Sequence, residues 1–366
     1  MKEIRNIIKF YENIVCSKEK LALASVVNVE ESSYRRIGAR MLISANGNWI
    51  GGISGGCLEG DALKRAQLAI FQNKPSRVTY DTMDDDSNQI GVGLGCNGRL
   101  DVLFVPIDRD KKDNPISLLK QIVKNKKPSV LLKIIESKDN ETLLGATILV
   151  EENDSEIKFC ALSSDQLLNA VQNTRIKRRP QVLELNNDRR EPLKILIEYL
   201  RPETKLIIVG DNYDVIAMLG IAKELGWETY IVGRKKKMSK AVFHKTKAVF
   251  EYEEIDDVPT DEYTAFVLMS HDYEWDKKLL PKILKRKPEY LGVLGPRKRM
   301  IKMQEELGIN IMDKYTFFHS PMGLDIGAES PEEIALSIAA EITAKFRQRD
   351  GQFLKLRTKP IHDRLL

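Results

Sequence analysis

A cysteine set among glycines is the feature of this sequence with the clearest chemical potential. Cys57 lies in the run Gly51-Gly52-Ile53-Ser54-Gly55-Gly56-Cys57-Leu58-Glu59-Gly60-Asp61. Glycine loses the most conformational entropy on folding, so such a run is costly unless the backbone needs left-handed torsions or approaches a ligand. Apolar residues then recur at helical spacing, which predicts a helix that begins at this loop.

A thiol at the start of a helix is well placed for ionisation. Unpaired backbone N–H groups and the helix dipole favour negative charge there, and the same field lowers the pKa of a thiol. We therefore predict that Cys57 is a thiolate and that the loop around Gly52, Ser54, Gly55 and Gly56 binds an anionic group. The alternative is a small buried cysteine beside a tight turn, which is the usual state of a free cysteine.

A second cysteine, Cys96, lies in a similar run, Gly91-Val92-Gly93-Leu94-Gly95-Cys96-Asn97-Gly98. The two thiols could converge on one ligand. Zinc fits poorly, since neither cysteine has another Cys or His at zinc-finger spacing. Two thiolates with backbone N–H donors better suit a soft or high-valent metal centre that carries an anionic cofactor. Cys57 and Cys96 are thus candidate metal ligands, and two unrelated buried cysteines are the alternative. Cys16 and Cys160 are predicted to be structural.

The elements that must position the first loop can be predicted from the residues before and after it. A helix is expected over 3–16 and a strand over 21–29. Asn46-Gly47, between the segments 40–45 and 48–50, predicts a hairpin with a type I′ turn that leads into the loop. After the helix over 58–72, strands are expected over 77–81, 100–105, 129–137 and 142–150. This half is therefore predicted to be a mixed α/β domain, and the polar stretch 174–192 is predicted to be a linker.

The second half begins with a βαβ unit of the dinucleotide-binding type, with strands over 205–210 and 227–232 and a helix over 213–225. Only Gly210 remains of the glycine fingerprint, and Asp211 and Asp214 would repel a pyrophosphate. Gly233-Arg234 stands where an acidic residue would bind a ribose. These residues argue against ordinary NAD(P) binding, although an NAD(P)-dependent oxidoreductase is the alternative function. The predicted fold is a Rossmann-like, doubly wound parallel sheet.

Two further motifs follow predicted strands of this sheet, where ligands of open parallel sheets bind. Ser270-His271-Asp272 is one, with a hydrogen-bonded structural histidine as the alternative. The other is Gly295-Pro296-Arg297-Lys298-Arg299, which opens a helix and makes Arg297 a candidate contact for an anion. A solvated basic face is its alternative. Further on, Ser330 and Glu333 form a capping-box pattern.

Composition limits the classes of function. The chain has 366 residues, a net charge of +5 and 30% charged residues, as expected for a protein of two or three globular domains. Four cysteines are too few for a disulfide framework, which favours a reducing, cytoplasmic location. No apolar run approaches the roughly 18 residues that span a membrane. The basic runs are not interleaved with aromatic residues, so nucleic acid is not an expected partner.

Taken together, the motifs resemble those of the XdhC/CoxI family of xanthine dehydrogenase accessory proteins. Residues 51–59 look like its GG-x-SGGC-x-E signature, and residues 93–98 look like its second cysteine motif. Residues 33–41, 292–299 and 320–333 are similar to further family segments, although Pro296 and Met322 depart from the usual residues. The turn at Gly210 departs too, since the family more often has a G-A-G-H-like sequence there.

The resemblance implies a family-type N-terminal domain over 1–173, the linker over 174–192, a Rossmann-like domain over 193–350 and a tail over 351–366. It also implies a cofactor chaperone rather than an enzyme that turns over. Such a protein binds molybdopterin, the molybdenum cofactor, protects it during sulfuration and delivers it to a xanthine dehydrogenase-type hydroxylase. Cys57 and Cys96 would be the ligands of the metal. A homodimer and a cysteine desulfurase partner are further expectations.

Overall fold

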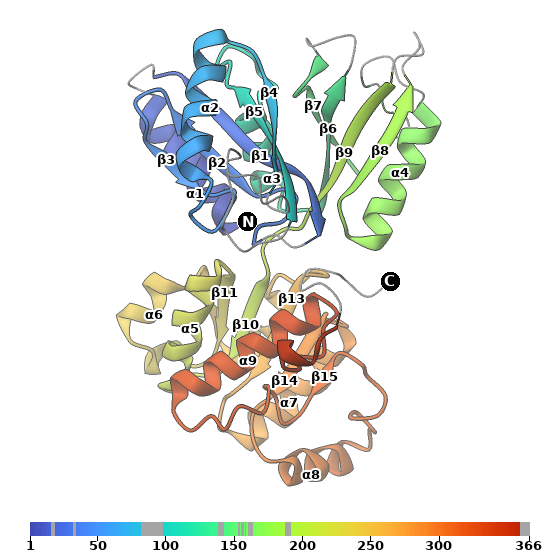
Figure 1. Cartoon of the computed structure of the whole chain (residues 1–366). Coiled ribbons are helices and arrows are strands. Elements are labelled where there is room, and N and C mark those ends of the chain that lie inside the picture. The colour runs from blue at the N-terminus through green and yellow to red at the C-terminus, as the bar shows by residue number, and fades with distance from the viewer. Residues whose placement is uncertain are drawn as a thin grey trace. The chain divides into compact units, whose positions relative to one another are not determined.

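The computed structural model of the chain consists of two compact units, Met1–Pro202 and Glu203–Thr358 (Figure 1). It describes residues 1–15, 19–31, 34–81, 98–137, 143–152, 154, 157, 159, 164–186 and 192–358.

The first unit contains a five-stranded antiparallel sheet of order β3-β2-β1-β5-β4. Side chains alternate along β1, so Ala22, Ala24 and Val26 pack toward α2 while Leu21 and Leu23 pack toward α1 and α3. The sheet is thus covered by helices on both faces. Its elements are α1 (Lys2–Val15), β1 (Leu21–Glu31), β2 (Arg40–Ser44), β3 (Trp49–Gly51), α2 (Glu59–Gln72), β4 (Ser76–Asp81), β5 (Gly98–Pro106) and α3 (Pro115–Asn125).

A second, four-stranded antiparallel sheet of order β7-β6-β9-β8 completes this unit. Its elements are β6 (Ser129–Ser137), β7 (Thr147–Val150), α4 (Ser164–Lys177), β8 (Gln181–Asn186) and β9 (Pro192–Leu200). The linker expected over 174–192 is therefore wrong for its described residues, because they form the end of α4, all of β8 and the start of β9. Leu183 and Leu185 of β8 pack against the core between the sheet and α4. They alternate with polar residues, which is the pattern of a half-buried strand.

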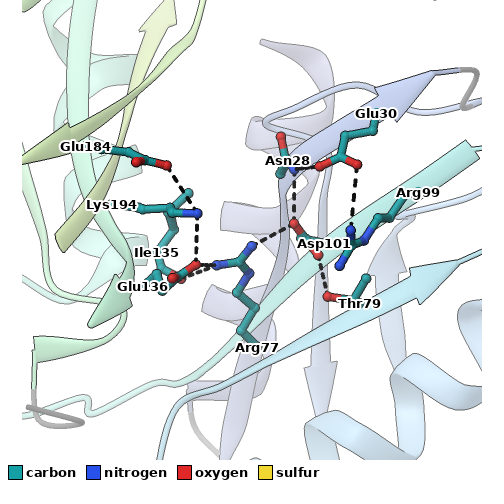
Figure 2. A network of polar contacts seen from close by, with 10 residues as sticks. All are labelled: Asn28, Glu30, Arg77, Thr79, Arg99, Asp101, Ile135, Glu136, Glu184 and Lys194. Atoms are coloured by element: carbon teal, nitrogen blue, oxygen red, sulfur yellow. Dashed lines mark hydrogen bonds and ion pairs between the residues drawn. The ribbon is translucent and has the colours of Figure 1, made fainter. Parts of the chain in front are cut away.

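Polar contacts join the two sheets of the first unit (Figure 2). Arg77 of β4 donates to Asp101 of β5 and to Glu136 of β6. Burial alone would raise the pKa of Asp101, but hydrogen bonds from Thr79, Arg77 and Asn28 outweigh it and hold that pKa below its ordinary value. Arg77 is therefore an electrostatic bridge between the sheets.

A buried charged cluster provides a second connection between these sheets. Arg40 of β2 pairs with Glu198 of β9 at 2.5 Å, and both side chains are less than a tenth exposed. Lys133 of β6 lies beside this pair and is 3.3 Å from the hydroxyl of Ser25 on β1. Burial, with the neighbouring charge of Arg40, lowers the pKa of Lys133 to about 8, although Glu198 partly offsets both effects.

The second unit is built on a six-stranded parallel sheet of order β12-β11-β10-β13-β14-β15. The order runs outward in both directions from β10, which confirms the doubly wound, Rossmann-like prediction. The strands are β10 (Lys205–Val209), β11 (Glu228–Val232), β12 (Ala248–Phe250), β13 (Thr264–Leu268), β14 (Tyr290–Val293) and β15 (Phe318–His319).

Helices cover both faces of the parallel sheet. One apolar layer contains α5 (Asp214–Leu225), α6 (Lys240–Lys245) and α9 (Pro331–Phe346), and the other contains α7 (Tyr273–Lys285) and α8 (Arg297–Leu307). The predicted capping box at the start of α9 is confirmed, since Ser330 and Glu333 exchange their side-chain-to-backbone hydrogen bonds.

Candidate functional site

The glycine loop follows directly from the β2–β3 hairpin, as predicted. The turn differs from the predicted type I′, because Gly47 has a positive φ and Asn46 does not. Strand β3 ends at Gly51, which has φ +84°, and a Cβ there would lie 2.2 Å from the carbonyl oxygen of Arg40. Glycine is therefore required at this position for the chain to turn from the strand into the loop.

Ser54 and Glu59 hold the loop together. Glu59 accepts hydrogen bonds from the backbone N–H of Ser54, at 2.9 Å, and from the Ser54 hydroxyl. The Ser54 hydroxyl oxygen in turn accepts from the N–H groups of Gly56 and Leu58. Burial alone would raise the pKa of Glu59, but these hydrogen bonds from Ser54 keep it below its ordinary value. The loop is thus pre-organised around a carboxylate of its own.

The hydrogen bonds within the loop reduce the number of N–H groups that can bind an anion. The N–H groups of Gly52, Ser54, Gly56 and Leu58 already have partners inside the protein. Within the described part of the chain, the N–H groups of Gly55 and Cys57 have none. The N–H groups of Gly52 and Ser54 therefore shape the loop, whereas those of Gly55 and Cys57 can donate to a ligand.

Gly56 and Cys57 face open space. Gly56 has φ +115°, and no atom lies within 4 Å of the position that a Cβ would take. Cys57 is exposed, so the alternative of a buried structural cysteine is wrong. By contrast, the ring of Tyr34 lies 3.4 Å from the corresponding position at Gly55. The open side of the loop is therefore at Gly56, next to the thiol.

Cys96 lies outside the described residues, and its convergence with Cys57 stays a prediction. No group of three or more His, Cys, Asp or Glu side chains in the described ranges could hold a metal ion. Asp61, at the start of α2, accepts from the Tyr80 hydroxyl at 2.8 Å and so has a structural partner.

A groove of about 680 Å³ lies beside the open side of the loop. Its walls are the first residues of α1, Arg35, strand β3 and the glycine loop, including Gly56 and Glu59. Its size falls within the usual range of small-molecule sites, roughly 300–1,000 Å³. Sequence reasoning identified the loop but missed this groove, because its other residues are far apart along the chain and form no motif.

At the carboxyl edge of the parallel sheet in the second unit, the charge of Asp211 is not free, as the prediction of a repelled pyrophosphate assumed. Asp211 makes a two-point ion pair with Arg234, at 2.5 and 2.9 Å. The side chain of Asp211 is fully buried. Arg234 is thus held by a carboxylate, and the charge of Asp211, which was predicted to repel a pyrophosphate, is neutralised.

The switch point of this sheet lies between β10 and β13. The predicted Ser270-His271-Asp272 motif lies at this point. His271 has φ +57°, and its Nε2 lies 2.6 Å from a carboxylate oxygen of Asp214. Asn212 donates to the carbonyl of Ser270 at 2.7 Å and so connects the two strand ends. His271 is hydrogen-bonded, as its structural alternative requires, yet half of its side chain is exposed.

The basic motif at the start of α8 separates into two parts. Arg299 pairs at 2.7 Å with Asp276, which is buried. Arg297 is the first residue of α8 and is exposed. Arg297 belongs to the second unit, whereas Cys57 belongs to the first, and its contact with an anion stays a prediction.

The described residues contain no helix that is both long and apolar enough to cross a membrane.

Sequence comparisons identify relatives over most of the chain. A family described as the XdhC and CoxI family matches residues 15–81, which include the glycine loop. A family described as the XdhC Rossmann domain matches residues 206–342, which include the parallel sheet.

Two relatives match almost end to end. A protein of Bacillus subtilis (strain 168), named as a probable subunit of xanthine dehydrogenase, is 26% identical over 89% of this chain and 93% of its own length. The molybdenum cofactor insertion chaperone PaoD of Escherichia coli (strain K12) is 21% identical over 93% of this chain and 88% of its own. A crystal structure of a protein described as a xanthine dehydrogenase, from Bacillus halodurans, shares the fold, with a TM-score of 0.73 and 25% identity. The match covers 94% of this chain and 96% of that one.

Proposed function

Because the chain belongs to the XdhC and CoxI family, we propose that it is a maturation factor that carries the molybdenum cofactor as its cargo. It binds the molybdopterin, protects it during sulfuration and delivers it to a xanthine dehydrogenase-type hydroxylase. The names of the two relatives support this role, since one is named for xanthine dehydrogenase and the other is a cofactor insertion chaperone. The proposed location is the cytoplasm, where such thiols stay reduced.

The observation that carries the proposal is the exposed thiol of Cys57 beside the empty position at Gly56. The missing Cβ lets a bulky group approach the backbone closely, and the N–H groups of Gly55 and Cys57 have no internal partners among the described residues. A thiolate is a suitable ligand for molybdenum, and backbone N–H donors suit its anionic ligands. The residues of the loop therefore fit this cargo.

Each part of the loop has a defined task in this proposal. Cys57 ligates the metal or shelters its labile sulfido ligand, and Cys96 acts as a second ligand or as a partner in thiol exchange. Glu59 and Ser54 keep the loop rigid, so that little order has to be created on binding. Arg297, in the second unit, stays a candidate contact for an anion. A homodimer and a cysteine desulfurase partner belong to the same proposal.

The test is retention and delivery of cargo by a Cys57→Ala variant. The full chain is loaded with purified molybdenum cofactor and desalted, and molybdenum and pterin are measured before apo-hydroxylase is added. We expect the variant to retain at most about one-tenth of the molybdenum that the wild type retains. Even changes to residues that only support metal ligands lower metal affinity by about this factor. A Cys16→Ala variant, which removes a thiol outside the loop, is the control. Equal retention and delivery by Cys57→Ala would refute the role of the thiolate.

A further inference from the structure

The groove beside the glycine loop has the features of a site for a planar polar ring. Trp49 lines it from β3, and its side chain is 51% exposed. In the described part of the chain its indole stacks on no other ring. An exposed tryptophan is a large, rigid surface on which a flat heteroaromatic ring can stack.

Other lining residues of the groove offer polar groups that can form hydrogen bonds with the edge of such a ring. Asn6 lines the groove from α1 and is exposed. Among the described residues no group bonds its amide, which presents a donor and an acceptor side by side. Next to it, Arg35 and Glu3 form a two-point ion pair at 2.6 and 2.7 Å that fixes this part of the groove.

The groove is also lined by the loop that carries the thiol. Gly56 and Glu59 line it there, and Cys57 is the next residue after Gly56. The Glu59 carboxylate is held by Ser54 but keeps lone pairs that can accept from ring N–H groups. A ligand whose ring lies in the groove would place its other end at Cys57.

From this arrangement we infer that the groove binds the pterin ring of the cargo, with its face against Trp49 and its amino-oxopyrimidine edge toward Asn6. The inference rests on the proposed function and adds the residues that recognise the organic part of the cofactor. A guanine base shares the same amino-oxopyrimidine edge, so the experiment has to distinguish the two ring systems.

The test is calorimetric titration of the full chain with hydroxymethylpterin phosphate, guanosine monophosphate and inorganic phosphate. We expect the pterin phosphate to bind at least about tenfold more tightly than inorganic phosphate, because stacking on an aromatic side chain contributes this much. Trp49→Ala should lose at least about tenfold in affinity, and Trp49→Phe should lose less because it retains an aromatic face. Asn6→Ala should weaken the pterin phosphate and leave inorganic phosphate unchanged.

Phe71→Ala is the matched control, since Phe71 is an exposed aromatic residue of the same unit that does not line the groove. Wild-type affinity in Trp49→Ala would overturn the ring site while leaving the chaperone proposal standing. Equal or tighter binding of guanosine monophosphate would overturn the assignment to a pterin. Cys57→Ala should bind the pterin phosphate like wild type. If it did so and also delivered cargo normally, the ring site would stand and the proposed thiolate role would fall.

Discussion

At the scale of single residues, Arg77 shows how much one side chain can contribute to the stability of the fold when it bridges two sheets. Its guanidinium contacts Asp101, whose side chain is 3% exposed, and Glu136, which is about one-third exposed. Removal of one partner from a buried ion pair costs more than the pair contributes, because the remaining charge stays desolvated. Arg99 on the neighbouring strand is a natural comparison, since its pair with Glu30 is 3.8 Å long and exposed on both sides.

We expect Arg77→Met to lower the free energy of unfolding by about 2 kcal/mol at neutral pH, between the values for exposed and buried pairs. Arg99→Met should change it by less than about 0.5 kcal/mol. Both carboxylates have pKa values below their ordinary ones, so their stabilisation is lost as the pH falls through those depressed values. Urea unfolding at pH 7 and below pH 4 measures both effects, and a cost equal at the two pH values would contradict this account.

The buried charge of Lys133 destabilises the folded chain, whereas that of Arg77 stabilises it. Its pKa is lowered to about 8 by burial and by Arg40, whereas in the unfolded chain it is close to 10.5. Between these two values the unfolded chain binds more protons than the folded chain. The stability of the wild type should therefore rise with pH across this window.

Lys133→Met removes the buried charge and leaves the ion pair between Arg40 and Glu198 intact. We expect this variant to be more stable than wild type at pH 7, by about 1–3 kcal/mol. The difference should shrink between pH 8 and the upper end of the window, as the wild-type lysine loses its proton. Lys194→Met, on an exposed ion pair, should show no such trend. A gap between Lys133→Met and wild type that is independent of pH would contradict the lowered pKa.

At the scale of elements, the sequence predicted the regular parts of the fold better than the contacts around the loop. The parallel sheet, the hairpin, helix α2 and the capping box of α9 follow from periodicity and turn residues, which are local signals. Strand β8 was missed because its polar positions and flanking prolines look like a linker. The role of Glu59 in holding the loop was missed too. Its carboxylate accepts hydrogen bonds from Ser54, and these depend on a loop geometry that residue spacing does not encode.

The groove, too, could not be predicted from local sequence signals. Asn6, Arg35 and Trp49 come from a helix, a loop and a strand that are distant in sequence, and only the packing of α1 beside β3 brings them together. A single sequence contains no signal for such a set. Cys57, by contrast, was predictable because glycines and thiol are contiguous.

The loop glycines give an element-scale prediction, since two of them have different tasks. At Gly51 a Cβ would lie 2.2 Å from a backbone oxygen, whereas at Gly56 it would meet no atom within 4 Å. Gly51→Ala should destabilise the first unit by more than about 3 kcal/mol or prevent its folding, because backbone must shift. Gly56→Ala should cost only the strain of its torsion, about 1–2 kcal/mol.

Gly56→Ala should nevertheless retain at least about tenfold less cargo than wild type, because its methyl group occupies the open side beside Cys57. Thermal unfolding followed by circular dichroism measures the first effect, and molybdenum analysis after loading measures the second. If both variants were equally destabilised, the distinction between a structural and a ligand-facing glycine would be wrong.

At the scale of the whole molecule, the boundary between the units lies at Pro202 and Glu203, ten residues after the start of β9 at Pro192. The sequence-based boundary at 193 cuts through β9, which lies between β6 and β8 in the four-stranded sheet. Leu193, Ile195 and Ile197 of this strand are buried in the core of the first unit. Removed from that unit, they would expose apolar surface and unpaired strand edges.

The fragment 203–358 should therefore fold alone, because it contains all six strands of the parallel sheet and both of its apolar layers. We expect a cooperative thermal transition and a dispersed amide NMR spectrum. The fragment 193–358 differs only by the ten residues 193–202 and should aggregate or be less soluble, because it carries the orphaned part of β9. Folding of the longer fragment alone would place the boundary before β9.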